Sequence, residues 1–225
     1  MRMLLLFQKG EQVRHLGHLD LQRTMQRALR RSGLPIAYSQ GFHPHVLLAF
    51  ASALSVGVSS DGEIADAPLS APASPEACLQ RMNAVLPPAL AACRVRLVTD
   101  HHPGLMGLLK QAAYDVLLPG ADAAAFADAA TAFLARDEVT ALRRSKRGET
   151  RVNIRPMAHA VTVTPDEAGT RLTLRLSLEE TATLKPLLLI QTLADLAGLP
   201  EPRARIHRLG LYGLPSGVLT PLMDC

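Results

Sequence analysis

The sequence predicts an α+β fold made of two tandem ferredoxin-like units, each a split β-α-β arrangement. Short apolar runs alternate with helical repeats in the order strand, helix, strand, strand, helix, strand. The same order recurs in the second half of the chain, as a pattern and not as a repeat of individual residues. A segment rich in His, Pro and Gly, 100–107, separates the halves. We therefore expect one unit at 1–100 and a second at 108–225.

Two helices are expected in the first half. Apolar residues recur at helical spacing across 18–32, and Gly33 ends this run. Ser74 followed by Pro75 is a strong helix start, and this second helix is expected to end near Leu86. A turn is expected at 40–44. The expected strands and extended segments are 3–7, 36–39, 46–50, 61–69 and 93–97.

The second half repeats the pattern, with an alanine-rich helix at 122–136 and a leucine-rich helix at 185–197. Its clearest signal is 171–178, where leucines alternate with polar residues and predict a half-buried strand. A turn at 165–169 leads into this strand. The other expected strands are 114–118, 139–143, 151–155, 160–164 and 205–211.

Basic residues are concentrated in two blocks, although the net charge is only +4. Residues 1–50 carry a net charge of +5 and residues 141–155 another +5, whereas 51–140 carry −5. Blocks of this kind favour a folded protein with a basic surface over a diffusely basic tail. A polyanionic partner is therefore expected.

Several classes of protein are excluded by composition. No apolar run reaches the roughly 18 residues that a membrane span needs. The apolar run in the first ten residues is too short for a signal peptide, and a charged residue follows it too early. Cys78, Cys93 and Cys225 form no Cys-x-x-Cys pair, so this chain holds no iron–sulfur cluster or zinc ion through cysteines. We expect a cytoplasmic protein without a cofactor and without a membrane partner.

A turn between two expected strands carries the first candidate site. Residues 38–45 read Tyr-Ser-Gln-Gly-Phe-His-Pro-His. Rings stack on unpaired bases and guanidinium groups contact phosphates, so this turn and the arginine-rich helix before it predict an RNA site. The candidate RNA-binding residues are Arg23, Arg27, Arg30, Arg31, Tyr38, Phe42, His43 and His45.

A basic hairpin is the second candidate site. Gly148 lies in an expected turn between two strands, where backbone amides and several guanidinium groups suit a phosphate chain. The candidate RNA-binding residues of this hairpin are Arg143, Arg144, Lys146, Arg147, Arg151 and Arg155.

The histidines leave two other chemistries open. A metal site would need His43 and His45 together with His15 or His18, but Pro44 disfavours the regular strand this requires, and no metal site is predicted. Metal-free RNA cleavage would use His18, His43 or His45 as acid and base. The leading interpretation is a non-catalytic module that binds structured RNA of the tRNA or rRNA class. A metal-free endoribonuclease and a protein–protein adaptor are the alternatives.

Several motifs together resemble one bacterial family. These motifs are His18-Leu-Asp-Leu, the run 27–45 that ends in the Tyr38–His45 turn, and Leu54-Ser-Val-Gly-Val58. They resemble the radical-SAM-associated domain-of-unknown-function family, and Asn153-Ile-Arg155-Pro156 is similar to that family's Asp-hydrophobic-Arg-Pro signature. His43 stands where the family usually has Asn, and Asn153 where Asp is common. The resemblance implies a radical SAM protein as a partner, which would carry the cysteine cluster that this chain lacks.

Overall fold

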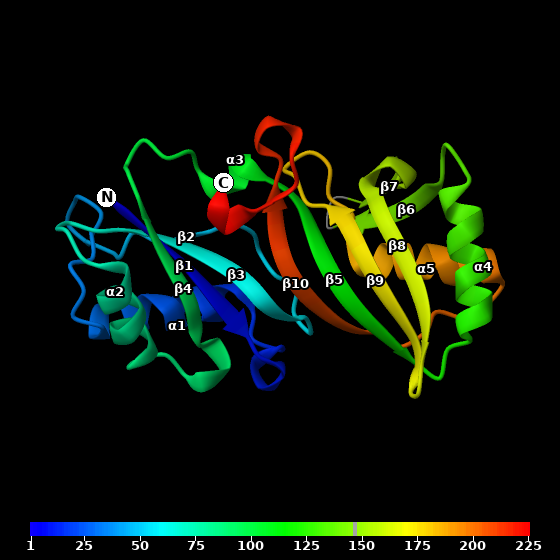
Figure 1. Cartoon of the computed structure of the whole chain (residues 1–225), viewed down its shortest axis with the longest axis horizontal. Helices are drawn as coiled ribbons and strands as arrows, with labels where there is room; N and C mark the ends of the chain where they lie inside the picture. Colours follow the sequence, from blue (N-terminus) through cyan, green and yellow to red (C-terminus); the bar gives the residue numbers. More distant parts are fainter. Residues whose placement is uncertain (146–147) are drawn as a thin grey trace. The chain divides into compact units, whose positions relative to one another are not determined.

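The computed structural model describes residues 1–145 and 148–225, without the side chains of residues 144 and 145. The chain is mixed α/β, with mostly antiparallel strand pairing and five α-helices among the described residues (Figure 1). It divides into two compact units. Unit 1 comprises Met1–Leu109 and Gly210–Cys225, and unit 2 comprises Lys110–Leu209. The folding of 1–100 and 108–225 as independent domains stays a prediction.

Unit 1 is built on a sheet whose middle strand is β1 (Arg2–Lys9). This strand pairs antiparallel with β3 (Ser59–Pro68) on one side and with β4 (Ala92–Val98) on the other. A short strand, β2 (Ala49–Phe50), pairs antiparallel with β3. The core of the unit forms where side chains of this sheet and of two helices meet, among them Met3, Phe7, Leu21, Met25, Leu29, Cys78 and Met82.

The two helices of unit 1 begin and end close to the capping residues that the sequence indicates. Helix α1 (His18–Arg31) buries one apolar stripe and exposes a polar face, and Gly33 follows it with a φ of 68°. Helix α2 (Pro75–Asn83) begins at Ser74, whose hydroxyl accepts a hydrogen bond from the Ala77 amide at 3.1 Å. It ends at Asn83, earlier than expected, and the Asn83 side chain exchanges two hydrogen bonds with the backbone of Ala92 in β4.

Unit 2 contains a second set of antiparallel strands. Strand β9 (Gly169–Ser177) lies between β5 (Leu109–Pro119) and β8 (Ala158–Asp166). Strand β10 (Arg205–Gly213) follows β5 on its other side, and its residues from Gly210 onward belong to unit 1. The alternation in β9 is observed as predicted, because its leucines are buried while Thr173 is exposed. The helices of this unit are α4 (Ala123–Leu134) and α5 (Pro186–Ala197), and α4 contacts β8, β9 and α5.

The turn between β8 and β9 shows why one glycine is required. Gly169 has a φ of 145°, and a Cβ atom at this position would lie 2.3 Å from the Leu118 carbonyl oxygen. No side chain fits there without moving the backbone of β5. The predicted turn at 165–169 is therefore confirmed together with its physical reason.

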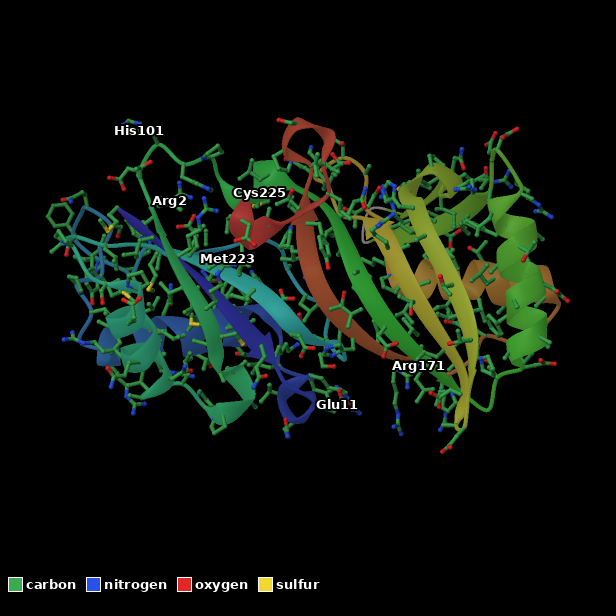
Figure 2. All side chains as sticks on the ribbon, viewed as in Figure 1. Arg2, Glu11, His101, Arg171, Met223 and Cys225 are labelled. Carbon is green, nitrogen blue, oxygen red and sulfur yellow. The ribbon has the colours of Figure 1, made fainter. Side chains whose placement is uncertain are left out.

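The remaining elements are short. Strands β6 (Thr140–Ser145) and β7 (Gly148–Asn153) form a separate two-stranded sheet in unit 2. Helix α3 (Leu105–Leu108) and strand β11 (Thr220–Pro221) belong to unit 1. There, Arg96 donates hydrogen bonds to the carbonyl oxygens of Met223 and Cys225, both labelled in Figure 2. The 3-10 helices are Glu11–Val13, Pro88–Leu90, Arg155–Met157, Pro215–Gly217 and Leu222–Asp224.

The mixed α/β class is confirmed, whereas the tandem ferredoxin-like arrangement is not confirmed by the fold. One expected strand, 46–50, is mostly replaced by other structure: only Ala49–Phe50 is a strand. The reason is that Val46 forms an isolated bridge with Tyr38, so this segment turns back on the one before it. Among the described residues, no helix combines the length and the apolar character that a bilayer crossing requires.

Candidate nucleic-acid interface

The aromatic and histidine side chains of unit 1 lie on a loop with fixed arms. The Ser39 amide donates a hydrogen bond to the His45 carbonyl oxygen at 2.9 Å, and the Leu47 amide donates to the Ala37 carbonyl oxygen at 3.2 Å. The Ala37 amide in turn donates to the carbonyl oxygen of Pro68, at the end of β3, at 2.9 Å. The tip of the loop, 40–44, is therefore presented from a base that is tied to the sheet.

The rings on this loop are open to solvent. Phe42 has a relative exposure of 102%, as much as a phenylalanine in an extended peptide, and Tyr38 is 44% exposed. His43 and His45 are exposed as well. Gly41, with a φ of 118° and no atom near the place of a Cβ, allows the chain to reverse at the tip. A fully exposed phenylalanine contributes nothing to the core, so this ring is available to stack on another flat group.

The histidines have local partners. The His45 Nδ1 atom lies 2.8 Å from the Ser39 hydroxyl, which also accepts a hydrogen bond from the His45 amide at 3.1 Å. His18 is half-buried, and its ring packs edge-on against Phe50 with 5.5 Å between centroids. No contact joins His18, His43 and His45 within 1–145 and 148–225. The same residues contain no group of three or more His, Cys, Asp or Glu placed to hold a metal ion.

Helix α1 exposes all four of its candidate arginines, while its apolar stripe is buried. Arg23 forms a 3.4 Å ion pair with Asp20, and Arg27 donates a hydrogen bond to the Thr24 hydroxyl at 3.1 Å. Both contacts are exposed, and exposed pairs of this kind contribute little. In the described part of the chain Arg30 and the neighbouring Arg31 have no ion-pair partner. The guanidinium groups of the helix could therefore bind a phosphate chain without the loss of a contact that stabilises the fold.

The basic hairpin of unit 2 distributes its arginines over two faces. In the register of β6 and β7, Arg143 is opposite Thr150, and Leu142 is opposite Arg151. Neighbouring residues of a strand point to opposite faces. Arg143 and Arg151 are thus both exposed but on different faces of the hairpin. The backbone of Arg144 pairs with Glu149. Two further candidates, Lys146 and Arg147, lie outside the described residues.

Arg155 has a structural environment that its sequence position did not indicate. Its guanidinium donates hydrogen bonds to the Leu134 carbonyl oxygen at 3.0 and 3.3 Å and to that of Ala158 at 3.3 Å. It also lies over the Phe133 ring, 5.8 Å from the centroid. It therefore caps the carboxyl end of α4. Asn153 helps to position Arg155: its side-chain oxygen accepts hydrogen bonds from the Val139 and Arg155 amides at 3.1 Å. This residue was the one sequence feature that could have indicated a structural role for Arg155.

Sequence reasoning also missed a polar contact on the sheet of unit 2. The His159 Nε2 atom lies 2.8 Å from the Ser177 hydroxyl, across strands β8 and β9. Burial, followed by the charge of Arg175, lowers the pKa of His159, while Glu179 acts in the opposite direction. Ser177 is only 4% exposed, so a substrate does not reach its hydroxyl. The contact therefore links β8 to β9 within unit 2.

A groove in unit 2 is the second feature that the sequence did not reveal. It has a volume of about 810 Å³ and is lined by residues of β6, of α5 and of the segments before them, and by Glu201 after α5. Leu142 and Leu187, which are 43% and 51% exposed, contribute apolar surface to it. The groove is distinct from the loop of unit 1.

The comparison with protein families gives one match. Residues 2–186 match the family described as "Uncharacterized protein conserved in bacteria (DUF2344)". This description mentions no radical SAM enzyme, so that association stays a prediction. Among curated proteins, none matches the chain. Because the family match covers well over half of the sequence, the chain belongs to the bacterial family DUF2344.

Proposed function

We propose that this protein is a non-catalytic module that binds structured RNA. The observation that carries the proposal is the fully exposed Phe42 on an anchored loop, in the same unit as a helix that exposes four arginines. An exposed ring and exposed guanidinium groups meet the two needs of RNA recognition, stacking on an unpaired base and neutralising phosphates.

The loop would recognise an unstacked base. Base–aromatic stacking contributes about 1–3 kcal/mol per base. The loop arms are hydrogen-bonded to each other and to β3. The backbone of the arms therefore loses little conformational entropy on binding. Tyr38 offers a second ring, and His43 and His45 offer donors and acceptors to a base edge.

The arginines would hold the phosphate chain. Exposed guanidinium groups on α1 provide the first set, and Arg143 and Arg151 of the hairpin provide a second. Arg155 is left out of this surface, because its guanidinium already bonds two backbone carbonyls. Each phosphate contact made to a single strand steepens the salt dependence of binding by about 0.7 in the log–log slope.

We infer further that the RNA is of the tRNA or rRNA class and that the module assists a modifying enzyme. The resemblance of 38–45 and 153–156 to radical-SAM-associated sequences supports a radical SAM partner. The antiparallel order β4-β1-β3, with β2 on β3, supports a ferredoxin-like architecture for unit 1.

The sharpest test uses the absence of tryptophan from the chain. Phe42→Trp introduces a single tryptophan at the tip of the loop. Addition of bulk tRNA is expected to quench its fluorescence as the indole stacks on a base. Val56→Trp is the matched control, since Val56 is 61% exposed in the same unit but outside the loop. Its fluorescence should change little.

A second variant measures the energy of the contact. Phe42→Ala is expected to weaken tRNA binding at least fivefold, the lower end of the 1–3 kcal/mol expected for one stacked base. Val56→Ala should leave the affinity unchanged. The proposal fails if the wild-type protein binds no RNA at low salt. Cleavage of the RNA that disappears in His45→Ala would favour the endoribonuclease instead, and co-purification of a radical SAM enzyme without RNA would favour the adaptor.

A further inference from the structure

In the part of the chain that the structure describes, strand β6 has one edge without a strand partner, because it pairs with β7 alone in a two-stranded sheet. The Ile154 amide donates a hydrogen bond to the Val139 carbonyl oxygen at 2.8 Å, so residue 139 and, by alternation, residues 141 and 143 direct their backbone groups toward β7. The backbone groups of Thr140 and Leu142 point the other way. Within the described residues no backbone group pairs with them, so they are available to another strand.

The open edge borders the groove described above. Thr140 and Leu142 line one wall, and Leu187 and Leu188 of α5 line the other. Leu142 and Leu187 are among the eleven large apolar residues that are exposed in the described part of the chain. A strand added to β6 would cover both leucines and satisfy the backbone of the edge. This combination is the geometry of strand addition, in which the backbone provides affinity and the side-chain pockets provide specificity.

The charges of the groove identify the kind of strand. Its lining contains three basic and three acidic residues, Arg136, Arg143 and Lys185 with Glu138, Asp195 and Glu201. A wall with balanced charge offers no net attraction to RNA or to a strand of one sign. Along β6 itself the charges are polarised: Asp137 and Glu138, which follow Arg136, give 136–139 a net charge of −1, and Arg143 and Arg144 lie near the far end of the strand. Two such strands running antiparallel place the acidic end of each beside the basic end of the other.

We propose that this edge binds a second copy of the chain, through antiparallel pairing of β6 with β6 around Thr140. The two hairpins then form one four-stranded sheet related by a two-fold axis, with Asp137 of each copy near Arg143 of the other. Because both copies use the same edge in such a two-fold interface, pairing stops at a dimer. The proposal goes beyond RNA binding and does not depend on it.

The test is the molar mass of the full-length protein in solution, measured by light scattering over a range of concentrations. The wild-type protein is expected to be a dimer that dissociates on dilution. Leu142→Lys places a charge on the edge and should give a monomer with an unchanged circular dichroism spectrum. Met106→Lys is the matched control, because Met106 is 65% exposed and lies in unit 1. It should remain a dimer and should bind tRNA as the wild type does.

A charge exchange tests the pairing itself. Asp137→Lys with Glu138→Lys, or Arg143→Glu alone, should each weaken self-association about tenfold, and the combination should restore it. A wild-type protein that stays monomeric, or a Leu142→Lys dimer as stable as the wild type, would overturn the proposal. So would a monomer that binds an unrelated extended peptide but not a synthetic peptide of residues 137–144, since the groove would then take a foreign strand. Failure of RNA binding leaves this result unaffected.

Discussion

The two basic blocks of the sequence have the same net charge but become different surfaces. In α1 the arginines recur at spacings of four, three and one residues, and all of them are exposed opposite a buried stripe. In the β6–β7 hairpin, Arg143 and Arg151 are on opposite faces. Arg155, the last residue of the block, bonds backbone carbonyls at the end of α4. The four arginines of α1 therefore form a single charged face, whereas the basic residues of 141–155 are divided. The other basic residues of 1–50 are Arg2, Lys9 and Arg14, and Lys9 is buried.

The difference comes from the period of each secondary structure. A helix returns to the same face every three to four residues, so clustered arginines stay together. A strand alternates at every residue, so clustered arginines are separated. Net charge over a window therefore does not measure the strength of a phosphate-binding surface. We expect the helix to dominate RNA binding, although the two blocks contribute equally to the charge of the chain.

The largest effect is expected from reversing the charge of the helix. A variant with Arg23, Arg27, Arg30 and Arg31 replaced by Glu should bind tRNA about a hundredfold more weakly at low salt, and its salt slope should be smaller by about 3. Arg143→Glu combined with Arg151→Glu should weaken binding by about tenfold or less. Titrations of labelled tRNA at several salt concentrations measure both quantities.

Unfolding must be excluded as the cause of this effect. All four arginines are exposed, and the polar contacts that Arg23 and Arg27 make with other described residues are exposed too, so the thermal midpoint should change little. A Lys replacement at the same four positions is the matched control, since it keeps the charge, and it should retain most of the affinity. If the hairpin variant lost more affinity than the helix variant, the comparison between the two surfaces would be reversed.

The next effect separates a structural arginine from a surface one. Arg155→Ala should lower the free energy of unfolding by about 2 kcal/mol, because the carbonyl oxygens of Leu134 and Ala158 lose a charged donor. Arg151→Ala, in strand β7, should change this free energy by less than about 0.5 kcal/mol. Urea denaturation of both variants gives the comparison. Equal stabilities would mean that Arg155 does not support the end of α4.

Local signals in the sequence were enough to predict several elements. The cap at Ser74, the glycine after α1 and the alternation in β9 each depend on residues close together in the chain. The exposed Tyr38–His45 loop belongs to this class, because Gly41 and Pro44 mark a turn in the sequence. For such features the local chemistry and the final structure agree.

Features that depend on distant partners were not predictable in the same way. The role of Arg155 depends on a helix end that lies 21 residues earlier in the sequence. The shortening of the 46–50 strand depends on the bridge between Tyr38 and Val46. The open edge of β6 follows from the absence of a second neighbour in its sheet, which periodicity does not report. A strand pattern gives the direction of side chains but not which edge is paired.

The smallest predicted effect distinguishes the two faces of the hairpin. If RNA lies along one face, Arg143→Ala and Arg151→Ala should not be equivalent: one should weaken tRNA binding about threefold and the other should leave it unchanged. Because Arg143 is also placed in the proposed self-association edge, the titrations are made at protein concentrations below dimer formation. Equal losses for both variants would mean that RNA contacts both faces of the hairpin. The division of its charge by strand alternation would then be irrelevant to binding.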